Sequence, residues 1–114
     1  MKKKRGALVT EAVVKSVQKR DGSIVPFDVE KITNAINKAM LASREGSLKE
    51  AGMVANKVYA DVLRIARKYK NFVPTVEGIQ DTVEKELILS EYVKTAKSYI
   101  LYRDNRAKLR AKRL

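Results

Sequence analysis

Three basic side chains stand around one short stretch of this 114-residue sequence. Lys19 and Arg20 precede an Asp-Gly pair at 21–22, and Lys31 comes three residues after Asp28. Asp-Gly between two extended runs predicts a β-hairpin, because glycine tolerates the positive φ that primed turns require. Asp28 is a typical N-cap, since its carboxylate can accept hydrogen bonds from the free amides of a first helical turn. The spacing therefore places two cations beside the turn and one at the helix start.

The lysine in the first helical turn indicates a ligand. A helix N-terminus carries a partial positive charge, so a cation such as Lys31 is not favoured there. A positive side chain next to unpaired backbone amides is typical of a site for an anion. We therefore predict a phosphate-bearing ligand over the hairpin. A basic turn followed by a capped helix is also common in small domains, so spacing alone leaves a purely structural interpretation open.

The composition excludes several kinds of site. The sequence has no cysteine and no histidine, which removes disulfides, thiolate metal sites, cysteine nucleophiles and the commonest general base. Its acidic residues do not follow the alternating spacing of a calcium loop, so no metal site is predicted. No apolar run is long enough to span a bilayer, and no signal-peptide pattern follows the basic N-terminus. We expect one globular domain in the cytoplasm.

The net charge of +12 is concentrated at the two ends of the chain. The basic residues at 2–5 contribute +4 and the segment 103–114 contributes +5, which leaves +3 for the body between them. Such ends bind nucleic acid or acidic membranes through phosphates, or they are solvated tails. No aromatic residue follows Tyr102 to stack on bases. This favours a basic mobile tail at 1–12 and a basic extension or linker at 107–114.

Hydrophobic periodicity predicts two short strands followed by four helices, because apolar residues alternate in the first part of the chain and then recur every three or four positions. The expected strands are the latter part of 13–19 and residues 24–27. The first three expected helices occupy about 29–44, about 48–70 and about 76–89. The fourth is expected to follow Ser90, with an apolar pattern that fades after Arg103. The predicted fold class is mostly α (α+β), a four-helix bundle capped by a small N-terminal β-hairpin. This domain is expected to occupy residues 13–106.

Capping residues set the expected helix ends. Gly46 is the expected left-handed cap of the first helix. Thr75 and Ser90 are the expected N-caps of the third and fourth helices. The fourth helix is expected to pack on the core through residues that include Val93 and Ile100.

Three blocks of the sequence resemble the ATP-cone domain. They are VQKRDGSIVPFDVEKI at 17–32, VPTVEGIQDTV at 73–83 and AKSYILYR at 96–103. Their order and spacing are similar to those of the family from about Ser16 to Arg106. ATP-cones occur at the N-terminus of many ribonucleotide reductases, and behind a zinc ribbon in a nucleotide-sensing repressor of reductase genes. Without cysteine, this chain resembles a reductase's regulatory domain or a stand-alone nucleotide-sensing relative.

The resemblance implies binding and allosteric regulation, without catalytic residues. In the family, ATP leaves the reductase active, whereas dATP switches it off, commonly by changing the oligomer. The implied effectors are ATP or dATP, with Mg²⁺ beside the phosphates. The implied partner is a catalytic domain or subunit of a ribonucleotide reductase. Homo-oligomerisation stays open, and no membrane partner is expected.

The resemblance also implies roles for individual residues. In the family, the basic pair before the hairpin glycine and the helix lysine bind phosphates, and these match Lys19, Arg20 and Lys31. Arg103 matches the basic residue of the last helix that closes the phosphate site.

The remaining matched positions lie on the base and sugar side. Residues from Val25 to Asp28 line the adenine in the family, and Asp28 can accept from its exocyclic amine as well as cap the helix. Thr75 and Gln80 fall where the third helix meets the ligand, with Thr75 nearer the ribose or phosphates. For Asp28, Thr75 and Gln80, a capping or surface role is the alternative interpretation.

Two other functions stay open. A basic helical nucleic-acid-binding domain would use the charged ends, would show steep salt dependence, and would retain binding after neutralisation of Lys19 and Arg20. A small phosphotransferase would also hold phosphates in a basic hairpin. The sequence has no Walker loop and no carboxylate clearly placed as a base, so the phosphotransferase is disfavoured.

Overall fold

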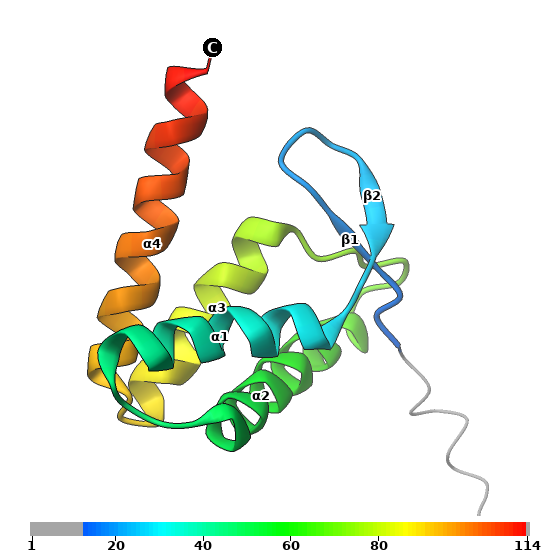
Figure 1. The fold of residues 1–114 in the computed structure, drawn as a ribbon. Helices are drawn as coiled ribbons and strands as arrows, with labels where there is room; N and C mark the ends of the chain where they lie inside the picture. Colours follow the sequence, from blue (N-terminus) through cyan, green and yellow to red (C-terminus); the bar gives the residue numbers. More distant parts are fainter. Residues whose placement is uncertain (1–12, 114) are drawn as a thin grey trace, which may run out of the picture.

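The structure, a computed structural model, describes residues 13–113 as a hairpin joined to a bundle of helices (Figure 1). The bounds of the elements are β1 Ser16–Gln18, β2 Ile24–Pro26, α1 Val29–Ser43, α2 Leu48–Ala66, α3 Val76–Leu89 and α4 Val93–Lys112. The predicted mostly α class, with a β-hairpin on a four-helix bundle, is confirmed. The expected tail at 1–12 lies outside the described residues. None of the described helices combines the length and apolar character needed to cross a membrane.

The hairpin turn contains one residue more than a primed two-residue turn. In the ladder, Val17 lies opposite Val25. The amide of Lys19 donates to the carbonyl of Ser23 at 2.8 Å, and the amide of Gly22 donates to the carbonyl of Lys19 at 2.9 Å. Gly22 has a φ of +91°, whereas a type I′ turn needs positive φ at both central residues. The loop is therefore a turn closed by a left-handed glycine, which explains why glycine stands there.

Contacts on two sides hold the hairpin on the helices. The amide of Gln18 donates to the carbonyl of Pro74 at 2.9 Å, and Gln18 forms a parallel bridge with Thr75 just before α3. On the other side, the ring of Phe27 stacks on Tyr59 of α2 with the ring centroids 5.5 Å apart. A two-stranded hairpin alone is marginal in water, so these contacts fix its position over the bundle.

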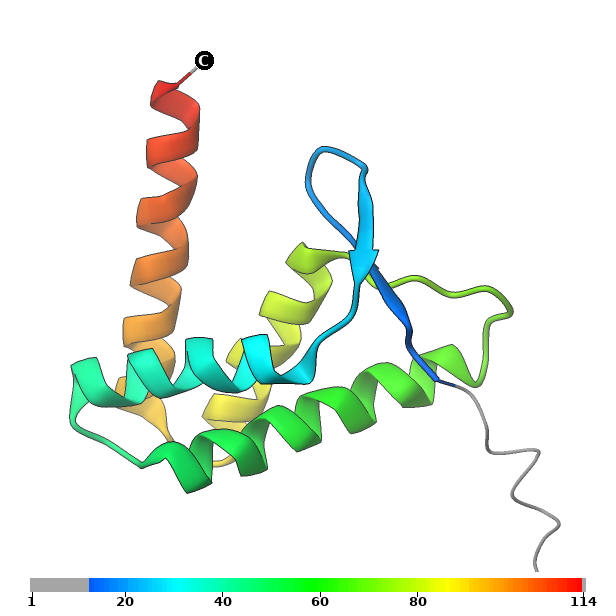
Figure 2. The same cartoon turned by 45° about the vertical axis from the view of Figure 1, so that its right-hand side comes forward.

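The helices enclose one apolar core. Helix α1 lies against α2 and α4, α2 lies against α3, and α3 lies against α4 (Figures 1 and 2). The large side chains buried most completely are Ile36, Met40, Val54, Val58, Val83 and Leu87. They recur at intervals of four along α1, α2 and α3, which is the period that buries one helical face.

The ends of α1 and α2 differ from the prediction. Arg44 (φ +57°), rather than Gly46, is the left-handed residue that ends α1. The amide after it donates to the carbonyl of Met40 at 3.1 Å, which is the bonding pattern of such a cap. Helix α2 ends at Ala66, and not near residue 70. The chain turns away, with Asn71 at a φ of +60°, because the segment before α3 must reach the β1 strand.

Ser90 closes α3 and does not open α4. Its amide donates back into the last turn of α3 at 2.9 Å, and α4 starts at Val93 without a side-chain cap of its own. The loop after α1 supplies one instead. The carboxylate of Glu45 accepts from the amide of Thr95 at 2.7 Å and from its hydroxyl at 2.8 Å. The prediction of Ser90 as N-cap was wrong because a distant carboxylate occupies that role.

Helix α4 extends beyond its apolar pattern, and its buried face is narrower than predicted. It continues past Arg103 to Lys112, and its last turns project from the bundle (Figure 2). Its buried residues are Thr95, Ala96 and Tyr99. Val93 and Ile100, expected in the core, are 62% and 40% exposed. The expected extension or linker at 107–114 is helical through Lys112, which agrees with the high helix propensity of Ala, Leu, Arg and Lys.

Candidate functional site

Two cavities adjoin between the hairpin, α1, α3 and α4. Their volumes are about 470 Å³ and 320 Å³. Both are lined by Lys31 and Ala35 of α1, Gln80 of α3 and Tyr99 of α4. Burial raises the pKa of Tyr99 to about 12, so its phenol is neutral at the wall between the two cavities. Together the cavities have the size of a small-molecule site.

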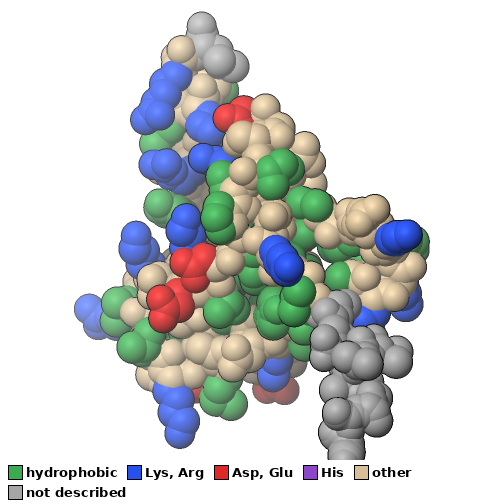
Figure 3. All heavy atoms as spheres, turned by 90° about the vertical axis from the view of Figure 1, so that its right-hand side faces the viewer, with side chains coloured by type: hydrophobic (Ala, Val, Ile, Leu, Met, Phe, Trp, Pro, Cys, Tyr) green, Lys and Arg blue, Asp and Glu red, His purple; other side chains and the backbone are tan. Residues whose placement is uncertain are grey.

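The larger cavity, which we call the basic cavity, gathers cations from three elements. They are Arg20 of the hairpin, Lys31 and Lys38 of α1, and Arg103, Arg106 and Arg110 of α4. Figure 3 shows Lys and Arg side chains gathered along the projecting end of α4. The lining residues within 13–113 include no carboxylate. Like charges lining one concave surface raise the local concentration of the opposite ion, so this cavity suits a multiply charged anion.

The smaller cavity, which we call the hairpin cavity, is mainly apolar. Its apolar lining comes from the hairpin segment, α1 and α3 and includes Val17, Val25, Phe27, Ile32, Val76, Ile79 and Val83. Lys19, Asp28 and Lys31 also line it. The carboxylate of Asp28 accepts from the amide of Glu30 at 2.9 Å, which confirms the predicted N-cap. An apolar slot with a few polar groups suits a flat ring with a polar edge.

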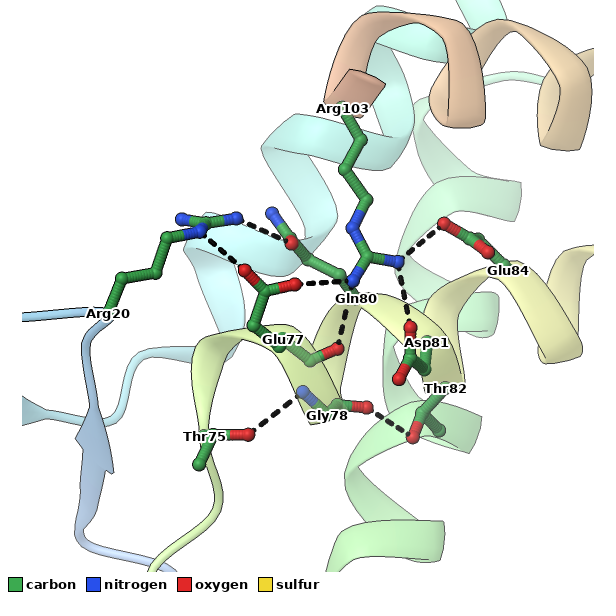
Figure 4. Close-up of polar contacts among 9 residues, drawn as sticks. All are labelled: Arg20, Thr75, Glu77, Gly78, Gln80, Asp81, Thr82, Glu84 and Arg103. Carbon is green, nitrogen blue, oxygen red and sulfur yellow. Dashed lines mark hydrogen bonds and ion pairs between the residues drawn. The ribbon is translucent and has the colours of Figure 1, made fainter. Parts of the chain in front are cut away.

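Two arginines from distant parts of the chain converge on the first turn of α3 (Figure 4). Arg20 Nε donates to Glu77 Oε2 at 2.6 Å, and Arg20 Nη2 donates to Gln80 Oε1 at 3.0 Å. Arg103 Nη2 donates to Glu77 Oε1 at 2.7 Å. The Glu77 carboxylate therefore bridges a hairpin cation and an α4 cation.

Arg103 also contacts two further carboxylates of α3. Its Nη1 donates to Asp81 Oδ1 at 2.8 Å and to Glu84 Oε2 at 2.7 Å. Burial opposes the charge of Arg103, but hydrogen bonds to Glu77, Glu84 and Asp81 outweigh burial and raise its pKa. Hydrogen bonds from Arg103 and then from Arg20 lower the pKa of Glu77. Arg103 and Glu77 are therefore both charged at neutral pH.

The structure brings most of the predicted site residues together. Lys19, Arg20, Val25, Asp28, Lys31, Gln80 and Arg103 line one or both cavities. Thr75 is not among the lining residues of either cavity. Its hydroxyl accepts from the amide of Gly78 at 3.0 Å, which confirms Thr75 as the N-cap of α3. A contact between Thr75 and a ligand stays a prediction.

Sequence reasoning missed the cations farther along α1 and α4. Lys38 lies two turns from the predicted lysine of α1, while Arg106 and Arg110 follow Arg103 at helical spacings of three and seven. That spacing was visible in the sequence, but the segment after residue 106 was interpreted as an extension or linker. Glu77 was also missed, because its partners lie 57 and 26 residues away.

The family model of the ATP cone domain matches residues 15–108, which include both strands and nearly all of the helical bundle. The chain belongs to the ATP-cone family. This agrees with the three blocks that resembled the family. Except for Arg110, the residues that line the two cavities of this ATP-cone lie inside the matched region.

This ATP-cone is similar to the N-terminal regions of ribonucleotide reductases. It is 46% identical over 103 residues to a vitamin B12-dependent ribonucleoside-diphosphate reductase of Thermoplasma acidophilum, covering 86% of this chain and 13% of that relative. It is 34% identical to a ribonucleoside-diphosphate reductase subunit alpha of Chlamydia pneumoniae, over 84% of this chain and 10% of the relative. It is 35% identical to an anaerobic ribonucleoside-triphosphate reductase of Haemophilus influenzae, over 85% of this chain and 13% of that relative. The chain thus spans about a tenth of the length of these relatives.

Proposed function

We propose that this ATP-cone binds ATP or dATP as an allosteric effector, as the regulatory domain of a ribonucleotide reductase. The observation that supports the proposal is the junction of the basic cavity with the apolar hairpin cavity. A nucleotide has the same two parts, a multiply charged phosphate chain and a flat base. Lys31 and Gln80 line both cavities, so a ligand bound across the junction contacts residues of both.

The phosphates are assigned to the basic cavity. The family resemblance implies Lys19, Arg20, Lys31 and Arg103 as the phosphate ligands. Arg20, Lys31 and Arg103 line the basic cavity, whereas Lys19 lines the adjoining hairpin cavity and is assigned to phosphate at the junction. Hydrogen bonds from charged donors to phosphate are about twice as strong as neutral ones. The dipole at the start of α1, where Lys31 lies, adds a favourable field for an anion.

The base is assigned to the hairpin cavity. Val25 and Asp28 both line this cavity, so Val25 is assigned to apolar contact with the base and Asp28 to accepting from the exocyclic amine of adenine. Guanine carries a carbonyl oxygen at that position, so this arrangement favours adenine. Gln80 lies between the two cavities, and with Thr75 it is assigned to the ribose side.

Mg²⁺ is assigned to the nucleotide and not to a protein cage. Within residues 13–113, no group of three or more His, Cys, Asp or Glu side chains is arranged to hold a metal ion. Mg²⁺ keeps several waters and commonly binds through substrate phosphates. The ion would lower the charge of the triphosphate that the cations of the basic cavity hold.

Regulation requires that ATP and dATP favour different states of the domain or its assembly. The two nucleotides differ in one ribose hydroxyl. A buried polar group that pairs with this hydroxyl in one complex and stays unpaired in the other supplies such a difference. The proposed partner is the catalytic domain or subunit of a cytoplasmic reductase, with homo-oligomerisation as one form of the response.

Calorimetric titration with ATP, dATP and GTP in the presence of Mg²⁺ tests this function. We expect adenine nucleotides to bind with micromolar dissociation constants and GTP to bind more weakly. A folded protein that binds none of the three, but binds duplex DNA with steep salt dependence, would instead support the nucleic-acid alternative.

A further inference from the structure

Glu77 occupies the guanidinium groups that the proposed function assigns to phosphate. Its two carboxylate oxygens accept from Arg20 at 2.6 Å and from Arg103 at 2.7 Å. A guanidinium offers a fork of N–H donors that fits a carboxylate or a phosphate in the same way. Phosphate oxygens can therefore take these donors only when Glu77 releases them.

We propose that Glu77 is a displaceable clasp of the nucleotide site. It holds Arg20 and Arg103 when no nucleotide is bound, weakens nucleotide binding by competing with the phosphates, and releases the hairpin turn from α3 when a nucleotide binds. The clasp rests on the proposed function, because its competitor is the phosphate chain.

The position of Glu77 gives the clasp its strength. It lies in the first turn of α3, where the helix dipole favours a negative charge. Hydrogen bonds from Arg103 and Arg20 lower its pKa, so it competes as a full carboxylate at neutral pH. It is nevertheless 52% exposed, so the side chain can swing into solvent without leaving an unpaired charge buried.

Release of Glu77 should affect the two arginines unequally, because Arg103 has more partners on α3 than Arg20 has (Figure 4). Without Glu77, Arg103 still donates to Asp81 and Glu84, so α4 stays attached to α3. Arg20 would keep only its contact with Gln80 among the side-chain partners seen within residues 13–113. The hairpin base stays bonded to the segment before α3. The predicted response is therefore confined to the hairpin turn.

Affinity for ATP with Mg²⁺, measured by calorimetry, tests the clasp. Glu77→Gln keeps the size and removes the charge, so we expect it to bind ATP about tenfold more tightly than wild type, which corresponds to about 1.4 kcal/mol. Glu77→Asp keeps the charge but is one methylene shorter, so it cannot reach both arginines and should bind with intermediate affinity.

Asp104→Asn is the matched control. Asp104 is an exposed carboxylate of α4 that forms an ion pair with Lys108 at 3.1 Å, so the variant changes net charge by the same amount without touching the clasp. Its affinity should stay within about twofold of wild type, because exposed charges are well screened. If Asp104→Asn increased ATP affinity as much as Glu77→Gln, the effect would be one of general charge, and the clasp would be wrong.

The Arg20 Nε–Hε signal in NMR spectra gives a second readout. In wild type, ATP should move this signal, whereas in ligand-free Glu77→Gln it should already have left its wild-type position. If wild type binds ATP and Glu77→Gln binds equally or more weakly, the clasp is wrong and the proposed function stands. If wild type binds no adenine nucleotide, both proposals fail.

Discussion

Glu45 and Thr95 join the loop after α1 to the start of α4. One oxygen of the Glu45 carboxylate accepts from the amide of Thr95 at 2.7 Å and from its hydroxyl at 2.8 Å. Thr95 is fully buried, and no side chain of α4 caps the helix. Helix α4 carries Arg103 and the arginines beyond it, which line the basic cavity. This contact therefore fixes the position of the start of the helix that forms one wall of that cavity.

Removal of this distant cap should destabilise the protein. We expect Glu45→Ala to lower the free energy of unfolding by about 1–2 kcal/mol, since it removes a cap and leaves the buried amide of Thr95 without its acceptor. The Thr95 hydroxyl keeps Ser43 Oγ as a partner at 3.0 Å. Glu45→Gln retains an acceptor and should cost less. Urea denaturation of both variants checks the order, with Asp104→Ala as an exposed control. Equal stability of wild type and Glu45→Ala would show that the cap contributes nothing.

Asp61 of α2 and Glu86 of α3 form a carboxyl pair with a predictable pH dependence. The hydrogen bond with Asp61 and burial raise the pKa of Glu86 above 4.5. Burial opposes the charge of Asp61, but hydrogen bonds from Glu86, Arg64 and Lys85 lower its pKa. Lys85 Nζ lies 3.2 Å from Asp61 and 3.8 Å from Glu86, and Lys57 also favours the ionised form of Glu86. Glu86 is therefore the member of the pair that takes up a proton first as the pH falls.

Glu86→Gln should remove part of this pH dependence. A group with a raised pKa contributes its full stability below its ordinary pKa and loses that contribution as pH rises through the folded value. Wild type should therefore lose stability relative to Glu86→Gln as pH rises from 4 towards neutral. Urea denaturation of both proteins across this range measures the difference. A difference that does not change with pH would contradict the shared proton.

The arginines on the far part of α4 should contribute to nucleotide binding. Arg106 and Arg110 line the basic cavity, whereas Lys108 and Lys112 of the same helix do not. We expect Arg106→Ala/Arg110→Ala to weaken ATP binding about fivefold and to reduce its salt dependence. Lys108→Ala/Lys112→Ala removes the same charge from another face and should have little effect. An equal loss of ATP affinity in the two double variants would mean that net charge, and not the position of the arginines in the cavity, determines affinity.

Local sequence signals predicted the starts of α1 and α3 correctly. The prediction failed at α4, where the cap comes from a residue distant in the sequence. Asp28 and Thr75 cap helices through amides two or three residues away, so their roles are visible in the sequence. Glu45 caps α4 from 50 residues away, and nothing in the neighbouring sequence distinguishes it from the other acidic residues. Ser90 was a reasonable N-cap by type, but it closes the preceding helix.

The same distinction applies to the site. Spacing predicted the hairpin cations, because the turn and the helix start are local features, and Lys19 and Arg20 line the cavities. Glu77 was not found, because its bond to Arg20 depends on how the hairpin lies over α3. Arg110 was missed for a different reason, since the length of α4 was underestimated where its apolar pattern faded.

Calorimetric titration of ATP with Mg²⁺ into Lys19→Ala/Arg20→Ala tests the central claim most directly. Lys94→Ala/Lys97→Ala is the matched control, because these lysines of α4 line neither cavity. We predict a micromolar dissociation constant, about −8 kcal/mol, for wild type and the control, and no measurable binding for the hairpin variant. Retention of wild-type affinity by a folded Lys19→Ala/Arg20→Ala protein would contradict a phosphate site at the hairpin.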